Sequence, residues 1–522
     1  MKTPGGARSL YDEVLYPVMT FPQTHPNRLA TVAFLRGMQP APASHCRVLE
    51  LGCGVGSNII GMAFQLPASE FIGLDLAQRP IASGQDFVKG LGLQNVTLYS
   101  MDICAPDTNQ LGRFDYVIAH GVYSWVPQPV RERILAICRE MLNPQGVAYI
   151  SYNAYPGNHL RDLVRGMIRF HTARFEDPID KVGQARGLLK FLADSSPKVD
   201  YYIAAIRAQF ERTLKYTDEA FFHDDLSEVN QPFYFHEFMS AAERHGLQFL
   251  GEARANDLEP GKFTPQVKQR MNELAGAPEV VQEQYKDFIR GCAFRETLLC
   301  HREAEIAPDL LVERVPKLYA SCDATLKEDE EDPSGQPTLF RRKGGLEMQA
   351  THPLISAALK YLVSQWPAAV FFEALLSAAR SATTGDLVDE IEILASTLSS
   401  AYRIGFVELR INPPELTNRA GERPSVSKLA RYQLERGEWA VNQIHVLTKF
   451  PDSLSRKLVQ LLDGTRDQET LRRDLLDFVQ SGQGALLENG VRIENIAQVE
   501  AILERRVREG LESLAREGML VS

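Results

Sequence analysis

The stretch "VLELGCGVGSN", residues 48–58, places three glycines on alternate positions directly before another apolar run, "IIGMAF". An apolar run that turns through glycines into a helical pattern is typical of the first strand, turn and helix of an α/β sheet. Glycines let the backbone bend tightly and let a ligand approach it closely. The turn therefore predicts a ligand that is held against bare backbone.

The spacing of the glycines separates two classes of ligand. A dinucleotide turn reads G-x-G-x-x-G, which would require a third glycine where Ser57 stands. The sequence instead has Glu50, then Gly52, Gly54 and Gly56 on alternate positions. This pattern favours a ligand without a phosphate, whose ammonium and carboxylate lie against the backbone. We expect S-adenosylmethionine.

Acidic residues at the ends of the next two strands support the same ligand. The run "EFIGLD" ends in Asp75, where a carboxylate can accept hydrogen bonds from both ribose hydroxyls. The next run, "NVTLYSMD", ends in Asp102, which is placed to accept from the adenine amino group with Ile103 against the ring. The predicted cofactor-binding residues are Glu50, Gly52, Cys53, Gly54, Asp75, Leu76, Asp102, Ile103 and His120. We expect Cys53 to act as a small packing residue rather than as a nucleophile.

The surrounding pattern predicts the fold. From residue 46 to 151, short β-branched runs alternate with helix-length segments, which indicates parallel strands joined by crossover helices. We expect an α/β, Rossmann-like doubly wound sheet whose last strand follows the Pro-Gly turn in "MLNPQGVAYIS" (141–151). A mostly α-helical middle domain is predicted next, followed by winged-helix-like C-terminal modules.

The length of 522 residues leaves room for three or four domains. An acidic segment at 327–338 is expected to be a solvated hairpin loop or wing, and residues 412–425 have the composition of a linker. The predicted domains are 1–155, which binds S-adenosylmethionine, a helical middle domain at 156–315, a winged-helix-like module at 316–412 and a second such module at 413–522.

Composition limits the function and the compartment. Lys and Arg number 57 against 67 Asp and Glu, and the net charge of −10 disfavours a non-specific nucleic-acid binder. No signal peptide and no apolar run of membrane-spanning length is present, so we expect a soluble, cytoplasmic protein. Seven scattered cysteines without a CxxC pair predict reduced thiols, and no metal is expected.

Several longer motifs resemble one family. They are "YPVMTFPQTHPNRLATVA" (16–33), "AHGVYSWVPQPVRERIL" (119–135), "SYNAYPGNHLRDLVRGM" (151–167), "NQPFYFHEFMSAAERHGLQFLGEA" (230–253) and "FRETLLC" (294–300). They resemble class I S-adenosylmethionine-dependent methyltransferases with a methyltransferase regulatory domain, which include the rickettsial outer-membrane-protein lysine methyltransferases. The resemblance implies that Gly52 and Gly54 line the methionine portion of the cofactor, that Asp75 holds the ribose and that Asp102 holds the adenine.

Methyl transfer from a sulfonium works mainly by alignment, so the family need not supply an obligatory acid or base. We predict that His120, Tyr123 and Tyr155 position the substrate, and that Trp125 and Tyr152 are packing residues. His120 has the alternative of a structural, hydrogen-bonded histidine. The segment from residue 16, with Phe21, is a candidate lid over the cofactor, or alternatively a plain starting helix. His236 and Glu237 are expected to serve the core and a helix cap rather than a metal.

The expected function is therefore an S-adenosylmethionine-dependent methyltransferase that acts on lysine side chains of a protein, where the lysine assignment rests on the resemblance alone. A small-molecule acceptor is the main alternative, and a non-catalytic S-adenosylmethionine-binding interaction protein is another. A nucleic-acid acceptor is disfavoured by the net charge. The helical middle region is a candidate interface for a homodimer.

Overall fold

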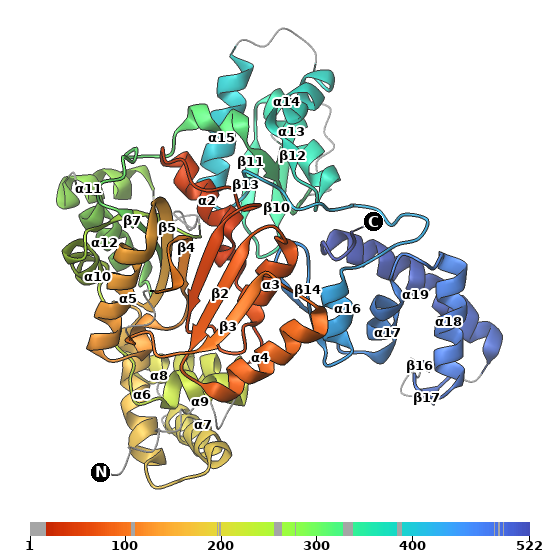
Figure 1. Cartoon of the computed structure of the whole chain (residues 1–522), viewed down its shortest axis with the longest axis horizontal. Helices are drawn as coiled ribbons and strands as arrows, with labels where there is room; N and C mark the ends of the chain where they lie inside the picture. The colour runs from red at the N-terminus through yellow and green to blue at the C-terminus, as the bar shows by residue number, and fades with distance from the viewer. Residues whose placement is uncertain are drawn as a thin grey trace.

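The computed structural model describes residues 17–105, 110–195, 197, 200–254, 264–276, 278–326, 338–383, 389–484, 486–488, 491–493 and 495–521. A sheet flanked by helices forms the first half of the chain, and two further modules pack beside it (Figure 1). The acidic segment expected to form a hairpin loop or wing lies almost wholly outside these residues, as does Tyr16 of the candidate lid.

A seven-stranded sheet is the centre of the structure, with strand order β3-β2-β1-β4-β5-β7-β6. Its first five strands are parallel, as predicted from the alternating pattern. They are β1 (Arg47–Leu51), β2 (Glu70–Asp75), β3 (Val96–Ser100), β4 (Phe114–Ala119) and β5 (Leu142–Asn153). Almost every residue of β1 and β4 is buried, because helices cover both faces of the sheet. The predicted Rossmann-like fold is confirmed.

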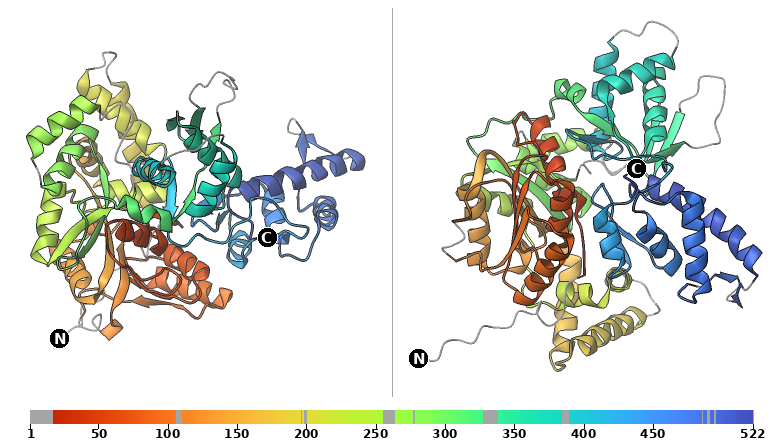
Figure 2. Two further views of the ribbon diagram at one scale, coloured as in Figure 1. Left: turned by 90° about the horizontal axis from the view of Figure 1, so that it is seen from above. Right: turned by 45° about the vertical axis from the view of Figure 1, so that its right-hand side comes forward.

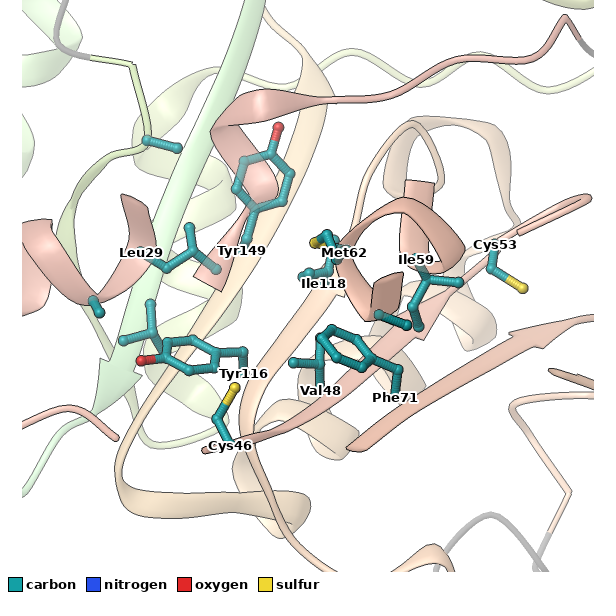
Figure 3. Packing of buried hydrophobic residues seen from close by; sticks show 14 of the residues in the cluster. Leu29, Cys46, Val48, Cys53, Ile59, Met62, Phe71, Tyr116, Ile118 and Tyr149 are labelled. Carbon is teal, nitrogen blue, oxygen red and sulfur yellow. The ribbon is translucent and has the colours of Figure 1, made fainter. Parts of the chain in front are cut away.

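The two faces have separate hydrophobic cores. Helices α2 (Pro26–Leu35), α3 (Ser57–Gln65) and α4 (Gln78–Leu91) cover one face, where Val48, Phe71 and Ile118 of the sheet meet Ile59 and Met62 of α3 (Figure 3). Helices α5 (Gln128–Met141) and α10 (Phe235–Arg244) cover the other. Alternate residues of each strand therefore point into different cores.

The expectation that the sheet ends with β5 is wrong. Strand β7 (Phe294–His301) pairs antiparallel with β5, and β6 (Leu247–Glu252) pairs antiparallel with β7. Both strands come from the region expected to be mostly helical. The strand β5 also begins earlier than expected, at Leu142, and the Pro-Gly segment forms an irregularity in its register with β4 rather than a separate turn.

Buried charged side chains in β7 explain why the pattern of hydrophobicity did not predict this strand. The Arg295 side chain is 3% exposed and bonds to Glu252, Glu283 and Asp287 at 2.7, 3.0 and 2.9 Å. Two of these carboxylates belong to α12 (Glu279–Arg290). A charged residue in a strand becomes compatible with the core only when such partners are supplied from elsewhere in the chain.

The rest of the middle region is helical, as expected. Four helices surround a small core of their own, built on Val164, Ile168, Leu189, Ile206 and Phe221. They are α6 (Asn158–Thr172), α7 (Pro178–Asp194), α8 (Tyr201–Thr213) and α9 (Asp218–Leu226). Helix α11 (Pro265–Ala275) precedes α12 and contacts it.

In its described residues, 316–326, 338–383 and 389–412, the next module has two small sheets and three α-helices around one core. Its strands are β8 (Tyr319–Ser321), β9 (Ala324–Leu326), β10 (Thr338–Arg342), β11 (Glu347–Ala350), β12 (Val370–Phe371) and β13 (Glu408–Arg410). Its helices are α13 (Pro353–Gln365), α14 (Phe372–Ser381) and α15 (Glu390–Arg403). Strands β9 and β10 pair antiparallel on either side of the acidic segment.

The described part of the C-terminal module has four helices and two short antiparallel strand pairs. They are α16 (Lys428–Leu434), β14 (Trp439–Val441), β15 (Leu447–Lys449), α17 (Ser453–Leu461), α18 (Gln468–Gln480), β16 (Leu487–Glu488), β17 (Val491–Arg492) and α19 (Ile496–Arg516). Helix α16 lies beside α4 of the first half of the chain (Figures 1 and 2). The ring of Tyr432 meets the ring of Phe87 edge-on at 5.0 Å, and Nζ of Lys428 donates to the carbonyl of Leu91 at 2.9 Å. Of the described helices, none is long and apolar enough to cross a membrane.

Candidate functional site

The glycine turn between β1 and α3 has the backbone conformation that the spacing predicted. Gly52, Gly54 and Gly56 have φ of +72°, +56° and +75°, a region that residues with a Cβ rarely adopt. A Cβ on Gly52 would lie 2.4 Å from Cγ2 of Val122, so that position tolerates no side chain. A Cβ on Gly54 would meet no atom within 4 Å. The backbone at Gly54 therefore borders open space that a ligand can occupy.

Asp75 at the end of β2 organises this turn. Its Oδ2 accepts from the amide of Gly54 at 2.8 Å, and its Oδ1 accepts from the amide of Ala77 at 2.9 Å. These two bonds fix the carboxylate at the edge of the sheet, next to the turn. The next side chain, Leu76, is 67% exposed at the same sheet edge. The structure thus places Asp75 and Leu76 next to the glycine turn.

Glu50 is buried beneath the turn and only half of its carboxylate is paired. Its Oε1 accepts from Nδ2 of Asn58 at 2.7 Å, whereas Oε2 is buried and lacks a hydrogen-bond partner among the described residues. Burial raises the pKa of Glu50 from 4.5 to about 7. A buried carboxylate oxygen without a donor suits a cationic group of a ligand, such as an α-ammonium.

The predicted adenine residues follow β3. Asp102 is exposed and its Oδ1 accepts from the amide of Cys104 at 2.9 Å. Ile103 is partly buried, and its carbonyl accepts from Nε of Arg133 at 3.2 Å. Cys53 is 9% exposed and burial raises the pKa of its thiol, a placement that favours packing over reactivity.

An aromatic group lies where β4, β5 and β7 meet the N-terminal segment. The ring of Phe21 packs on that of His120 with centroids 3.6 Å apart, and Phe294 meets His120 edge-on at 6.1 Å. Nδ1 of His120 bonds to the hydroxyl of Tyr149 at 2.8 Å. Burial lowers the pKa of His120 to about 3, so its imidazole is neutral at physiological pH. The candidate lid segment thus covers His120, and helix α2 begins only after it, at Pro26.

The other predicted positioning residues lie in different surroundings. Tyr123 is 3% exposed, and its ring packs among Tyr152, Phe233 and Phe238. This core placement favours packing over contact with a substrate. The hydroxyl of Tyr152 bonds to Oγ1 of Thr297 at 3.2 Å, in keeping with its predicted packing role.

Tyr155 and Trp125 are both in contact with α6. The Tyr155 hydroxyl donates to Asp162 at 2.8 Å and its ring stacks on His159 at 4.0 Å. The guanidinium of Arg161 lies 5.6 Å above Trp125.

His236 and Glu237 lie at the start of α10. His236 Nδ1 lies 2.9 Å from Oε1 of Gln284, and Oε2 of Glu237 accepts from the amide of Tyr234 at 2.9 Å. The capping role predicted for Glu237 is confirmed. The described residues contain no group of three or more His, Cys, Asp or Glu side chains that could hold a metal ion.

Several residues of this region were not singled out from the sequence. Glu296 of β7 is 6% exposed, and it accepts from Nε2 of Gln23 at 2.7 Å and pairs with Arg254 at 2.8 Å. Phe294 begins β7 and is 43% exposed. Asn58 is a polar residue in the first turn of α3, directly before the apolar run at 59–64, and this position was the available signal.

Comparison with known proteins matches three parts of the chain to family models. A methyltransferase domain covers residues 49–148, a predicted methyltransferase regulatory domain covers residues 217–301, and the "PKMT, C-terminal winged helix domain" covers residues 422–519. The last match confirms the winged-helix fold predicted for the C-terminal module.

Relatives cover nearly the whole chain. RP789 of Rickettsia prowazekii, described as uncharacterized, is 30% identical over an alignment of 525 positions that covers 98% of this chain and 93% of RP789. PKMT2 from Rickettsia typhi, solved in complex with AdoHcy, superimposes with a TM-score of 0.87 at 26% identity and covers 97% of this chain and 100% of that one. The chain belongs to the family of S-adenosylmethionine-dependent methyltransferases that carry a methyltransferase regulatory domain.

Proposed function

We propose that this methyltransferase acts on lysine side chains of a protein substrate. The full-length likeness to PKMT2 from Rickettsia typhi carries this proposal, because the likeness extends beyond the cofactor-binding sheet into the middle and C-terminal modules. It agrees with the resemblance of the sequence motifs to lysine methyltransferases.

In this proposal the cofactor lies along the glycine turn. The open space at Gly54 admits it, Glu50 faces its ammonium, Asp75 binds the ribose hydroxyls, and Asp102 and Ile103 hold the adenine. When bound, S-adenosylmethionine supplies an electrophilic methyl group on its sulfonium sulfur. The residues of this chain then have to hold an amine in line with that methyl group and keep water away, which can contribute roughly 7–11 kcal/mol.

The aromatic group of Phe21, His120 and Phe294 is the proposed site for the acceptor amine. Presenting a lysine amine in its neutral form at pH 7 costs roughly 5 kcal/mol. An apolar, aromatic wall offsets part of this cost because it disfavours the ammonium form. The neutral imidazole of His120 adds no repelling positive charge. Tyr155, which lies against α6, is a second candidate for positioning the substrate.

A pocket of about 350 Å³ beside this group supports a peptide over an apolar small molecule. It is lined by Gln23 of the N-terminal segment and by charged side chains, among them Arg28, Arg254, Arg342 and Glu408. Pockets for drug-sized molecules are lined mainly by apolar side chains. A small-molecule acceptor is the second candidate, since the pocket is large enough for one.

Exposed apolar side chains on the helical middle region favour self-association as a further part of the proposal. Phe170, Phe191 and Tyr201 are 87%, 67% and 90% exposed on α6, α7 and α8. Large exposed apolar side chains of this kind are common at interfaces between subunits when they form a patch. Light scattering of the purified chain is expected to give the mass of a dimer, and substituting all three residues by serine is expected to give a monomer.

The substrate assignment is tested by incubation with radiolabelled S-adenosylmethionine and fractionated lysate. We expect the label in protein, released as methylated lysine on acid hydrolysis. The Gly54→Val variant is the matched control, because its side chain fills the space at the turn. Label in metabolites or nucleic acid, with none in protein, would contradict the proposal.

A further inference from the structure

The winged-helix domain reaches the cofactor-binding helix through the loop between β14 and β15. His445 in this loop is 1% exposed and has φ of +63°, an uncommon value for a residue with a Cβ. Its ring lies against α3 at Gly61, where a Cβ would stand 2.8 Å from Cε1 of His445. A glycine in the middle of α3 thus permits the contact, although glycine is unfavourable in a helix.

Asn58 connects this loop to three parts of the active site. Its Nδ2 donates to Oε1 of Glu50 at 2.7 Å and to Oγ1 of Thr24 at 3.0 Å. Its Oδ1 accepts from the amide of Phe21 at 2.9 Å and lies 2.9 Å from Nε2 of His445. An amide side chain has two donors and two acceptor lone pairs, so all four positions of Asn58 are used.

These bonds determine the role of His445. Because the Phe21 amide can only donate, the oxygen of Asn58 must face it, and Nε2 of His445 must therefore carry a proton and donate. Nδ1 of His445 is buried without a hydrogen-bond partner among the described residues. The backbone carbonyl of His445 is held by Oγ1 of Thr20 at 3.1 Å. The ring has one function in these contacts, to donate to Asn58.

We propose that His445 is a positioning residue for cofactor binding, and that the winged-helix domain completes the cofactor site through the chain His445, Asn58 and Glu50. When His445 is absent, the oxygen of Asn58 loses one of its two donors, and the amide is held by three hydrogen bonds instead of four. Glu50, which accepts from the same amide group, is then oriented less firmly. The C-terminal module therefore contributes to cofactor binding, in addition to any part that it has in selecting the acceptor.

The inference rests on the proposed role of Glu50 and is tested by steady-state kinetics and calorimetry on the full-length chain. For His445→Ala we expect the KM and the Kd for S-adenosylmethionine to rise about 5- to 10-fold, the effect of one lost hydrogen bond, with kcat at saturating cofactor within about 2-fold. His445→Gln retains a donor and is expected to restore both constants to within about 2-fold of the wild-type values. A merely structural role does not predict this rescue.

Two further variants make the outcome decisive. Gly61→Ala favours the helix but displaces His445, so it should weaken cofactor binding as His445→Ala does, even if the latter fails to fold. Lys428→Met removes a hydrogen bond from the same domain interface without touching Asn58, and should leave the Kd unchanged. Unchanged cofactor binding in His445→Ala or Gly61→Ala, or equal weakening in Lys428→Met, overturns the inference. If Glu50→Gln weakens binding while His445→Ala does not, the proposed cofactor site stands and only the role of His445 is excluded.

Discussion

Replacing Glu50 by glutamine should stabilise the cofactor-free protein and weaken its cofactor binding at the same time. The carboxyl group is 3% exposed, and burial raises its pKa from 4.5 to about 7. Holding the ionised carboxylate in the folded chain therefore costs roughly 3 kcal/mol relative to the unfolded chain. Glutamine keeps an oxygen for Asn58 and carries no charge, so it avoids this cost.

The pH dependence of the effect follows from the direction of the pKa shift. Below about pH 4.5 the carboxyl is protonated in both states, and the wild type and Glu50→Gln should be equally stable. Between pH 4.5 and 7 the unfolded chain releases the proton before the folded chain does, so the wild type loses stability as the pH rises. Above pH 7 the free energy of unfolding of the variant should exceed that of the wild type by the full cost of holding the ionised carboxylate in the folded chain.

The assay is urea denaturation of both proteins without cofactor at pH 4.5, 6 and 8. The free energy of unfolding is taken from the transition in which the domain that contains the sheet unfolds. Asp86→Asn is the matched control, because Asp86 is exposed on α4 and its substitution should change nothing. Calorimetry should show S-adenosylmethionine binding about 10- to 100-fold more weakly to Glu50→Gln, the effect of losing a charged partner. A stability difference that does not change with pH, or unchanged cofactor affinity, would refute the reasoning.

Three other variants test the glycine turn, the role of Asp75 and the placement of Tyr123. Gly54→Val should abolish cofactor binding measured by calorimetry, because it combines an unfavourable φ with a side chain in the ligand space; binding within 10-fold of wild type would contradict this. Asp75→Ala removes the acceptor of two amides and should lower the free energy of unfolding in urea by about 1–2 kcal/mol, besides weakening cofactor binding, and an unchanged urea midpoint would count against its organising role. Tyr123→Phe should keep kcat within about 2-fold, because the ring belongs to the core, and a loss above 10-fold would place its hydroxyl in the chemistry.

The parallel part of the fold was predictable because its information is local. Each strand of "RVLEL", "EFIGLD" and "FDYVIA" is a short apolar run followed by a segment of helix length, and parallel strands require such crossovers. The glycine turn and the acidic strand ends were predictable for the same reason. Each of these features lies within about thirty residues of the next along the chain, between Glu50 and Asp102.

The remaining features depend on contacts between distant segments. Strand β7 pairs with β5 across the whole helical middle region, and its charged residue Arg295 is compatible with burial only because Glu252, Glu283 and Asp287 surround it. A pattern of hydrophobicity along the sequence contains no sign of those partners.

Contacts in the candidate site between distant segments could not be predicted from the sequence for the same reason. Asn58 and His445 are 387 positions apart, so no local motif could have joined them. Tyr123 follows shortly after the end of β4 at Ala119, as a site residue would, but its ring packs in the core against Tyr152 and Phe238.

The central claim is that the glycine turn, with Glu50 and Asp75, recognises S-adenosylmethionine. It is tested most directly by calorimetric titration of the folded chain with S-adenosylhomocysteine, beside Gly54→Val as the control. The account predicts saturable binding of one molecule per chain for the wild type and none for the variant. No binding by the folded wild-type chain, or equal binding by both, would contradict it.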